Sequence, residues 1–354
     1  MGSRFARNLT PPKKRIHPYN QQYVLLSGGV TLGSDFTSEV GPKPSGVPFI
    51  WRWREVRESL LLACDALPES TTARRTIACL NPGLPRSGTT HTLMASMQMV
   101  QPGELAWAHR HSISALRYGV EGGPGLFTVV DGEALPMEPN DLILTPAWCW
   151  HDHHNESGKK GVWLDVLDLP LVGGLGQLAY AKFGETAQPI QEQRTIPDDD
   201  RGRLVRPGLV APPADRPPLR YPWSDVEKRL SSLAADEGHP VDGVMLEYID
   251  PATGGPVFPA MSCNIQMLRP GFQTRRHRRT SSSICYVVEG GGRTIVDGQE
   301  IDWSARDVFA LPPWMWLQHI NTSPNERAVL FVVNDAPLLK KMGIYREERD
   351  ADAG

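Results

Sequence analysis

The sequence predicts a mainly β protein with two antiparallel barrels per chain, and three observations lead to this. Glycine (33) and proline (32) are both abundant among the 354 residues, which is typical of short strands joined by tight turns. Leu116, Tyr118 and Val120 alternate with other residues in the period-two pattern of a strand. The same pattern occurs twice, because Pro, Gly, His, Arg, Tyr, Val, Glu, Gly and Gly recur at one fixed offset in residues 102–123 and 270–291.

Two further blocks follow each copy in the same order. TVVDG (128–132) matches TIVDG (294–298), and DLILTPAWCWHDHHN (141–155) matches DVFALPPWMWLQHIN (307–321). Three aligned blocks in one order indicate a duplicated barrel rather than two hairpins that are similar by chance. A barrel of this size can hold one ligand or metal ion in its mouth.

The remaining segments divide the chain into five expected parts. These are an N-terminal arm and helix (1–70), a first barrel (71–186), a proline-rich linker and helix (187–240), a second barrel (241–340) and a C-terminal tail (341–354). Helical spacing of apolar residues predicts the first helix from Trp51 to Ala66. In the linker, Ser224 and Glu227 predict a capping box for a helix from Asp225 to about Ala235.

Composition excludes several classes of protein. The net charge of −3 favours neither nucleic acid nor an anionic membrane as a partner. The five cysteines show no CxxC spacing, which argues against a disulfide framework and predicts a reducing, cytoplasmic location. We find neither an apolar run of about 20 residues nor the apolar core of a signal peptide.

Three histidines form a candidate metal site in the first barrel. His109 and His111 lie two residues apart on an expected strand, so both should point into the barrel. We expect His151 to reach the same point from a strand across the barrel. Three neutral imidazoles occupy one face of a metal ion and leave positions open for a bidentate substrate and O2.

The second barrel has lost two of these three residues. His277 stands at the place of His109, but Arg279 and Leu317 replace the other two histidines. We therefore expect this barrel to lack a metal, and weak binding by His277 and His319 is left open.

The spacing around the histidines resembles the two cupin motifs. Gly103 and the His109–His111 pair match the first motif, and residues 140–155 match the second. Asn140 and Trp148 stand where the motif has glycine, and the glutamate of the first motif is absent. The resemblance implies double-stranded β-helix (cupin) barrels, two per chain, with a few helices in the arm and linker.

Longer blocks resemble one group of double-cupin (bicupin) enzymes, gentisate 1,2-dioxygenase with salicylate 1,2-dioxygenase and 1-hydroxy-2-naphthoate dioxygenase. The blocks are AHRHSISALRY (108–118), LILTPAWCWHDHHNE (142–156), WLDVLDLP (163–170), NPGL (81–84) and VVNDAP (332–337), and the resemblance covers most of residues 50–340. It implies one Fe(II) per chain in the first barrel and a homo-oligomer, a dimer or tetramer. The family reaction uses O2 to cleave an aromatic ring between the carboxyl- and hydroxyl-bearing carbons.

Candidate substrate-binding residues follow by position. Arg117 lies an even step after His111, which predicts an inward side chain, and it matches the substrate-binding arginine of the family. Arg74 matches another family arginine, although its neighbour Arg75 is an alternative for the inward position. Gln98 matches a glutamine that lines the pocket.

Other positions concern proton transfer and specificity. His153 should face the pocket, either as an acid/base for the ring hydroxyl or as a hydrogen-bond donor behind the metal site. Asp165 matches an acid that orients Arg117 or a metal-binding histidine. Ser70, Met94 and Ser96 replace residues common in relatives with broad specificity, so the wall near the ring is altered.

These substitutions leave the substrate open. Gentisate is the default, and a 5-substituted salicylate such as 5-nitrosalicylate is the alternative. Two other functions are another cupin metalloenzyme, such as a thiol dioxygenase or an isomerase, and a non-enzymatic bicupin binding protein. A binding protein has no need of an intact histidine set in one barrel alone, so the asymmetry of the two barrels counts against it.

Overall fold

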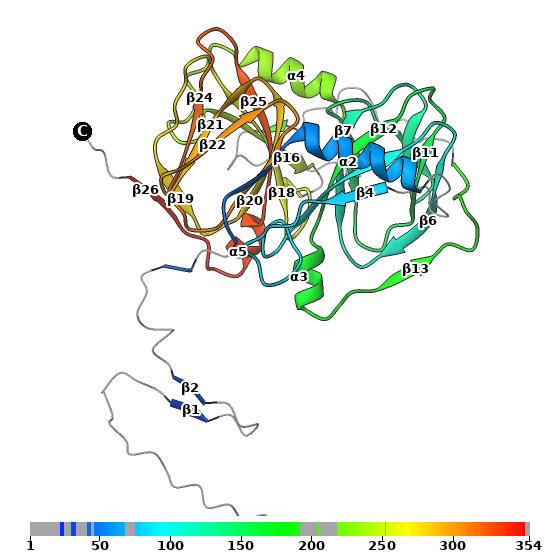
Figure 1. Ribbon diagram of the computed structural model, residues 1–354, viewed down its shortest axis with the longest axis horizontal. Coiled ribbons are helices and arrows are strands. Elements are labelled where there is room, and N and C mark those ends of the chain that lie inside the picture. Colours follow the sequence, from blue (N-terminus) through cyan, green and yellow to red (C-terminus); the bar gives the residue numbers. More distant parts are fainter. Residues whose placement is uncertain are drawn as a thin grey trace, which may run out of the picture. The chain divides into compact units, whose positions relative to one another are not determined.

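The structure is a computed structural model that describes residues 41–43, 46–67, 75–191, 218–251 and 253–350. It also gives the backbone of three short strands, β1 (Gln22–Val24), β2 (Val30–Leu32) and β14 (Leu204–Val205). One compact unit covers residues 43–354, and β1 pairs with β2 in a separate unit over residues 1–42 (Figure 1). Ser70, Arg74 and residues 192–203 and 206–217 of the expected linker lie outside the described residues.

The first barrel consists of two antiparallel sheets. The six-stranded sheet has the order β15 (Arg220–Tyr221), β10 (Leu142–Thr145), β7 (Ala115–Glu121), β12 (Gly161–Leu167), β5 (Met94–Val100), β4 (Arg75–Ala78). The five-stranded sheet has the order β13 (Tyr180–Lys182), β6 (Leu105–His111), β11 (His151–Asn155), β8 (Leu126–Val130), β9 (Glu133–Pro136).

The second barrel repeats this arrangement. Its larger sheet has the order β14, β16 (Val244–Asp250), β18 (Ser262–Leu268), β25 (Ala328–Asn334), β20 (Ser283–Glu289), β23 (Val308–Leu311), β3 (Phe49–Trp51), and β17 (Gly255–Pro256) pairs with β16. The smaller sheet has the order β22 (Gln299–Ser304), β21 (Gly291–Val296), β24 (Leu317–Asn321), β19 (His277–Arg279), β26 (Glu347–Arg349). The expected pair of antiparallel barrels is confirmed.

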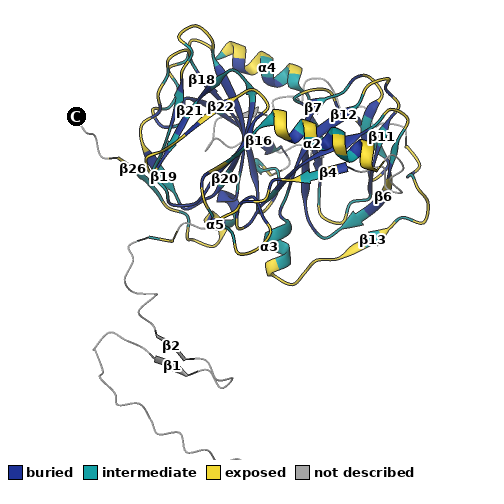
Figure 2. Cartoon of the chain, viewed as in Figure 1, coloured by how far each residue is buried: buried dark blue, intermediate teal, exposed yellow. Residues whose placement is uncertain are grey.

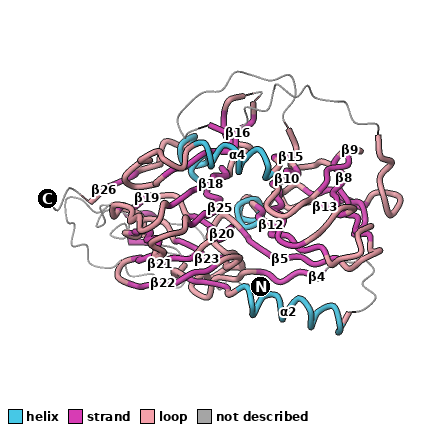
Figure 3. The backbone as a smooth tube through the Cα atoms, turned by 90° about the horizontal axis from the view of Figure 1, so that it is seen from above, coloured by secondary structure: helices cyan, strands magenta, loops and turns pink. Residues whose placement is uncertain are grey.

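Four helices accompany the sheets in the described part of the chain: α2 (Trp53–Ala66), α3 (Leu169–Gly174), α4 (Trp223–Ser232) and α5 (Ala336–Lys341). Figure 3 shows α2 along one edge of the molecule, near β4. None of these helices is long and apolar enough to cross a membrane.

The capping box of Ser224 and Glu227 that was predicted for the linker helix is wrong. Helix α4 begins at Trp223, and its N-cap is Pro222 in an extended conformation, so Ser224 lies inside the first turn. The backbone N–H of Trp223 donates to Asp141 Oδ1 at 2.7 Å, and Glu227 pairs with Arg327 instead. Pro222 and the carboxylate of Asp141, which directly precedes β10, therefore start this helix.

Segments at both ends of the chain complete the second barrel. Trp51, expected in the first helix, lies in β3 and pairs with Val308 of β23. Helix α2 starts two residues later and buries Val56, Leu60 and Cys64 in the core. The expected C-terminal tail contains β26, which pairs with β19. Local periodicity cannot show such pairings, because the partners are far apart in sequence.

One hydrophobic core spans both barrels. Its buried residues include Tyr118 from the first barrel and Tyr286 and Phe331 from the second. The rings of Tyr118 and Phe331 stack with centroids 4.1 Å apart. Figure 2 shows buried residues along the strands and exposed residues on the outer faces of α2 and α4. The larger sheets thus bury a shared interface.

We expect Phe331→Ala to lower the free energy of unfolding by about 3–5 kcal/mol, because it removes a buried ring that both barrels contact. Chemical denaturation followed by circular dichroism would measure the change. The control is Phe127→Ala, since Phe127 is only half-buried on the first barrel. Equal losses in the two variants would contradict the shared interface.

Candidate metal centre

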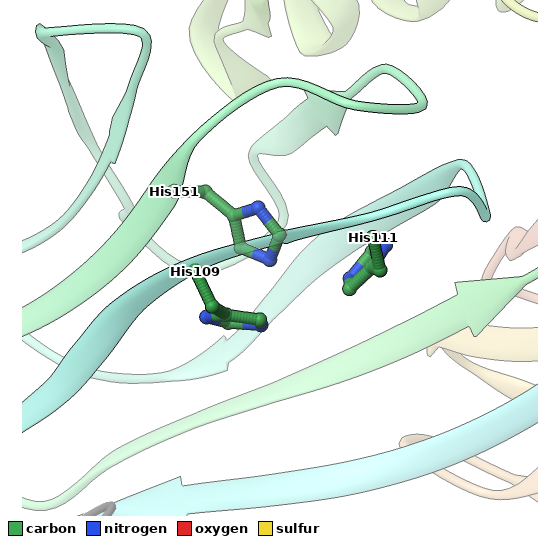
Figure 4. A group of neighbouring side chains, drawn as sticks. All are labelled: His109, His111 and His151. Atoms are coloured by element: carbon green, nitrogen blue, oxygen red, sulfur yellow. The ribbon is translucent and has the colours of Figure 1, made fainter. Parts of the chain in front are cut away.

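His109, His111 and His151 come together in the first barrel (Figure 4). One ligand atom from each lies within 4.8 Å of the others, close enough for the three residues to hold a single metal ion. His109 and His111 lie on β6, and His151 lies on β11 directly opposite His109 in the strand register. The expectation that His151 crosses the barrel is wrong, because β11 is the neighbour of β6 in the same sheet.

Backbone carbonyls hold all three imidazole rings. Because a carbonyl oxygen can only accept a hydrogen bond, each Nδ1 carries the proton and each Nε2 keeps its lone pair for a metal. His151 Nε2 is buried and has no hydrogen-bond partner among the described residues. The Nδ1 atoms donate to Trp107 O (2.9 Å, His109), Ile113 O (2.8 Å, His111) and Cys149 O (3.1 Å, His151).

Burial and a nearby positive charge keep His151 in the neutral form that binds metal. Burial lowers the pKa of His151 well below its usual value, and the positive charge of Arg117 acts in the same direction. His151 is therefore a neutral imidazole at pH 7. Three neutral nitrogen donors without a carboxylate suit a divalent transition metal that keeps open positions for exogenous ligands. The residues present thus fit a metal ion.

Arg117 enters the site from the opposite sheet. The turn at residues 112–114 separates β6 from β7, so the even number of residues between His111 and Arg117 does not fix the direction of the arginine side chain. Its position within β7 fixes that direction. Arg117 is 4% exposed, and its Nε lies 3.3 Å from Asp165 Oδ1 on β12. Its positive charge is one of the causes that lower the pKa of His151.

Two residues that support Arg117 were not foreseen. Thr145 Oγ1 accepts a hydrogen bond from Arg117 Nη1, and the Trp163 indole N–H donates to Asp165 Oδ2 at 3.1 Å. The Arg117–Thr145 contact depends on the pairing of β7 with β10, and no local sequence signal could have identified it. Trp163 and Asp165 lie two residues apart on β12, so their side chains share one face of that strand.

Strand β5 forms a wall beside these groups. Ser96 pairs with Asp165 in the register and Gln98 pairs with Trp163, and both side chains are buried. Met94 is half-buried at the start of the same strand. Gln98 Nε2 is buried without a hydrogen-bond partner in the part of the chain that the structure describes, so a polar donor stays available there.

His153 is buried on β11, two residues after His151. Its Nδ1 lies 2.9 Å from Thr128 Oγ1, and its ring lies beside Trp163 at a centroid distance of 5.0 Å. His154 points elsewhere, because it is half-buried against Phe127 and its Nε2 bonds to Asp152 at 2.8 Å.

Of Arg74 and Arg75, the two candidates for the inward position, the structure describes Arg75 alone. Arg74 lies outside the described residues. Arg75 is buried, and its guanidinium pairs with Glu104 at 2.5 Å and bonds to the Leu67 carbonyl at 2.6 Å. These contacts tie β4 to the start of β6 and give Arg75 a structural role.

Tyr180 is a neighbour of the histidines that sequence reasoning missed. It lies on β13 opposite His111, and its ring centroid is 5.3 Å from that of His109. Its side chain is 58% exposed, so it borders the site on the solvent side. Strand β13 lies outside the motifs, which explains why no pattern indicated it.

The substituted glycine positions keep the glycine conformation. Asn140 and Trp148 adopt left-handed backbones with φ of 69° and 65°. The Arg110 guanidinium lies 5.3 Å from the Trp148 ring centroid and 4.4 Å from that of Trp150. This stack packs the two tryptophans against Arg110, next to the start of the strand that carries His151.

The second barrel fills the equivalent position with ion pairs. His277 lies opposite Leu317, as His109 lies opposite His151. Arg279, at the place of His111, pairs with Asp242 at 2.9 Å and with Glu347 at 3.1 Å. A charged side chain with two carboxylate partners replaces a metal ligand there.

We expect His111→Ala to lose metal binding, because it removes one of three donor atoms. Titration of the chelator-treated protein with Co²⁺, followed by visible absorbance and metal analysis, would show about one ion per chain in the wild type and almost none in the variant. The matched control His277→Ala should keep the wild-type stoichiometry. One tightly bound ion in His111→Ala would show that the assignment is wrong.

Buried histidines also predict how stability depends on pH. Burial lowers the pKa of His277 to about 4 and that of His319 to about 3, from 6.5 in the unfolded chain. Below pH 6.5 the unfolded chain takes up these protons first. The free energy of unfolding of metal-free protein should therefore fall between pH 6.5 and 4, by up to about 3 kcal/mol from His277.

Denaturation curves at several pH values would measure this fall. His277→Gln should make it less steep, since one proton-linked group is removed. An unchanged slope in that variant would exclude His277 as a contributor.

Comparisons with known proteins agree with this architecture. The Cupin domain family model matches twice, over residues 96–167 and 264–334. The chain is 42% identical to 1-hydroxy-2-naphthoate 1,2-dioxygenase from Nocardioides sp. (strain KP7), over 88% of this chain and 81% of that protein. It is 38% identical to 5-aminosalicylate 1,2-dioxygenase from Comamonas sp, over 91% and 86%.

A solved structure extends the likeness to three dimensions. Salicylate 1,2-dioxygenase from Pseudoaminobacter salicylatoxidans, determined as adducts with gentisate, matches with a TM-score of 0.74 and 27% identity. The match covers 90% of this chain and 88% of that one. The three-histidine site, the two cupin domains and these relatives lead to one conclusion: the chain belongs to the gentisate and salicylate 1,2-dioxygenase family of double-cupin, ring-cleaving enzymes.

Proposed function

We propose that this enzyme binds one Fe(II) through His109, His111 and His151 and cleaves an aromatic ortho-hydroxy carboxylate with O2. Cleavage falls between the carboxyl- and hydroxyl-bearing ring carbons. The observation that carries the proposal is a cluster of three imidazole nitrogens in a barrel whose other sheet contains the buried Arg117. When bound, the iron supplies a redox-active Lewis acid with positions open to the substrate and O2.

Arg117 is the group proposed to hold the substrate carboxylate. A guanidinium presents paired N–H donors that match the two oxygens of a carboxylate. Asp165 and Thr145 fix its orientation, since each contacts it from a neighbouring strand. The buried amide of Gln98 is a further donor for a polar group on the bound ring.

The duplication supports these roles, because the second barrel acts as an internal comparison. The repeat and the strand register place Cys285 at the position of Arg117 and Val332 at that of Asp165. Leu311 stands at the place of Thr145. The counterparts of Arg117, Asp165 and Thr145 are therefore lost together with two of the three histidines, as expected if they serve one reaction, whereas Gln266 keeps the glutamine of position 98.

The same comparison favours a positioning role for His153. His319 stands at its place in the second barrel, and its Nδ1 lies 2.8 Å from Thr294 Oγ1. The His153–Thr128 contact is thus kept in a barrel that has lost the other site residues. We propose that His153 orders the strand behind His151 and does not transfer the ring-hydroxyl proton.

The substrate is proposed at the level of class. Met94 and Ser96 line the wall beside Asp165, and a small residue at 96 leaves room next to the ring. The named relatives act on 1-hydroxy-2-naphthoate, 5-aminosalicylate and salicylate, and all of these carry adjacent carboxyl and hydroxyl groups. We keep gentisate and 5-substituted salicylates as candidates and add the bicyclic naphthoate.

Location and assembly are proposed more briefly. All five cysteines are free thiols, which suits the reducing cytoplasm. Leu175, Leu178 and Tyr180 are large, exposed hydrophobic residues near β13, and they suit a contact between copies in a homo-oligomer.

Oxygen uptake by protein reconstituted anaerobically with Fe(II) tests the function. The substrates would be gentisate, salicylate, 5-aminosalicylate, 5-nitrosalicylate and 1-hydroxy-2-naphthoate, with ring-cleavage products followed by absorbance. We expect one O2 per molecule of at least one substrate. No uptake by iron-loaded protein with any of them would leave a thiol dioxygenase, an isomerase or a binding protein.

Arg117→Lys should raise the KM for the active substrate by about 10- to 100-fold, because the paired hydrogen bonds to the carboxylate are lost. Steady-state oxygen uptake measures the effect, and metal analysis should show unchanged iron content. The matched control is Arg220→Lys, whose arginine pairs with Asp141 at the sheet edge. An unchanged KM in Arg117→Lys would remove this residue from the substrate site.

A further inference from the structure

A cavity of ≈ 450 Å³ lies within the second barrel, where no site has been assigned. Residues of β16, β18 and β25 line it, together with α5 and β26. A smaller cavity of ≈ 40 Å³ adjoins His277 and His319. Arg279 and Asp242 line both, so their ion pair forms part of the wall between them. The larger volume falls within the range of about 300–1,000 Å³ of small-molecule sites.

This cavity is the counterpart of the proposed substrate pocket. The repeated tyrosines Tyr118 and Tyr286 align the two barrels, and counting along the paired strands places Asn264 at the position of Ser96. Ser262 likewise corresponds to Met94. Both residues line the large cavity. Duplication has therefore produced a second pocket wall with more polar side chains.

Three polar side chains line this cavity without a hydrogen bond or ion pair between them: Asn264, Glu247 and Lys340. Asn264 is 5% exposed, and its side chain makes no hydrogen bond within the described ranges. Glu247 and Lys340 both line the cavity, and Lys340 attracts the Glu247 carboxylate, yet these two described residues form no ion pair within 4.0 Å. Burial raises the pKa of Glu247 despite that attraction, so its charge is incompletely compensated.

Four further charged residues of the cavity are paired with one another, and the Lys340 ammonium lies 5.1 Å from the centroid of the Tyr345 ring. Arg279 contacts Asp242 and Glu347, and Arg349 also contacts Glu347. A simple anion could therefore pair with Lys340 but would be repelled by the Glu247 carboxylate. A simple cation could pair with Glu247 but would be repelled by Lys340. A molecule with both charges matches the separated Glu247 and Lys340.

We propose that the second barrel binds a small zwitterion of amino-acid type, with its ammonium group on Glu247 and its carboxylate on Lys340. Asn264 supplies a hydrogen bond at the buried end. Val332 and Met245, which also line the cavity, contact an apolar side chain of the ligand. The site needs no metal and is independent of the proposed iron centre.

Isothermal titration calorimetry of the full-length protein tests the proposal with three probes. L-phenylalanine carries both charges, L-phenylalaninamide carries only the ammonium, and N-acetyl-L-phenylalanine carries only the carboxylate. We expect L-phenylalanine to bind best. Glu247→Gln and Lys340→Gln should each weaken its binding about tenfold or more, while oxygen uptake with the active ring substrate stays at the wild-type rate.

The His111→Ala variant separates this site from the iron centre. It should bind L-phenylalanine with wild-type affinity. The proposal is overturned if L-phenylalanine does not bind, or if either single-charge probe binds equally well. It is also overturned if Glu247→Gln and Lys340→Gln leave the affinity unchanged, or if His111→Ala loses it, which would assign the binding to the first barrel.

Discussion

The antiparallel pairing of β6 with β11 is the constraint on which the first barrel depends. It brings His151 opposite His109 although 41 residues separate them in sequence. A shift of one residue in this register would turn His151 to the outer face and destroy the ligand set. The carbonyl that bonds each Nδ1 lies two residues from its histidine, so the backbone next to each histidine orients its ring.

The second barrel shows which parts of this arrangement belong to the fold. It keeps the strand order, the His319–Thr294 contact and the left-handed backbone at Trp314. It loses two of the three histidines and the Arg117–Asp165 pair, whose buried charges are costly to remove from water. An Arg279 ion-pair cluster fills the vacated place, so polar groups there stay satisfied.

Sequence patterns predicted what is local or repeated. The period-two alternation identified the strands, and the repeat identified two barrels and the difference between His111 and Arg279. They could not predict that Trp51 belongs to a strand of the second barrel, because its partner Val308 is distant in the chain. Thr145 escaped notice for the same reason. The inward position of Arg117 was predicted by counting residues from His111. That count ignores the turn at residues 112–114, so it could not fix the direction of the side chain.

The terminal strands of the two smaller sheets explain how one fold supports two kinds of site. Strand β13 pairs with β6 and places Tyr180 opposite His111. Strand β26 pairs with β19 in the equivalent way and places Glu347 opposite Arg279. Each added strand thus sets the chemistry next to the same barrel position, an aromatic ring in one case and a carboxylate in the other. Because neither strand belongs to a cupin motif, these positions can change without disturbing the barrel, and the two sites can diverge independently.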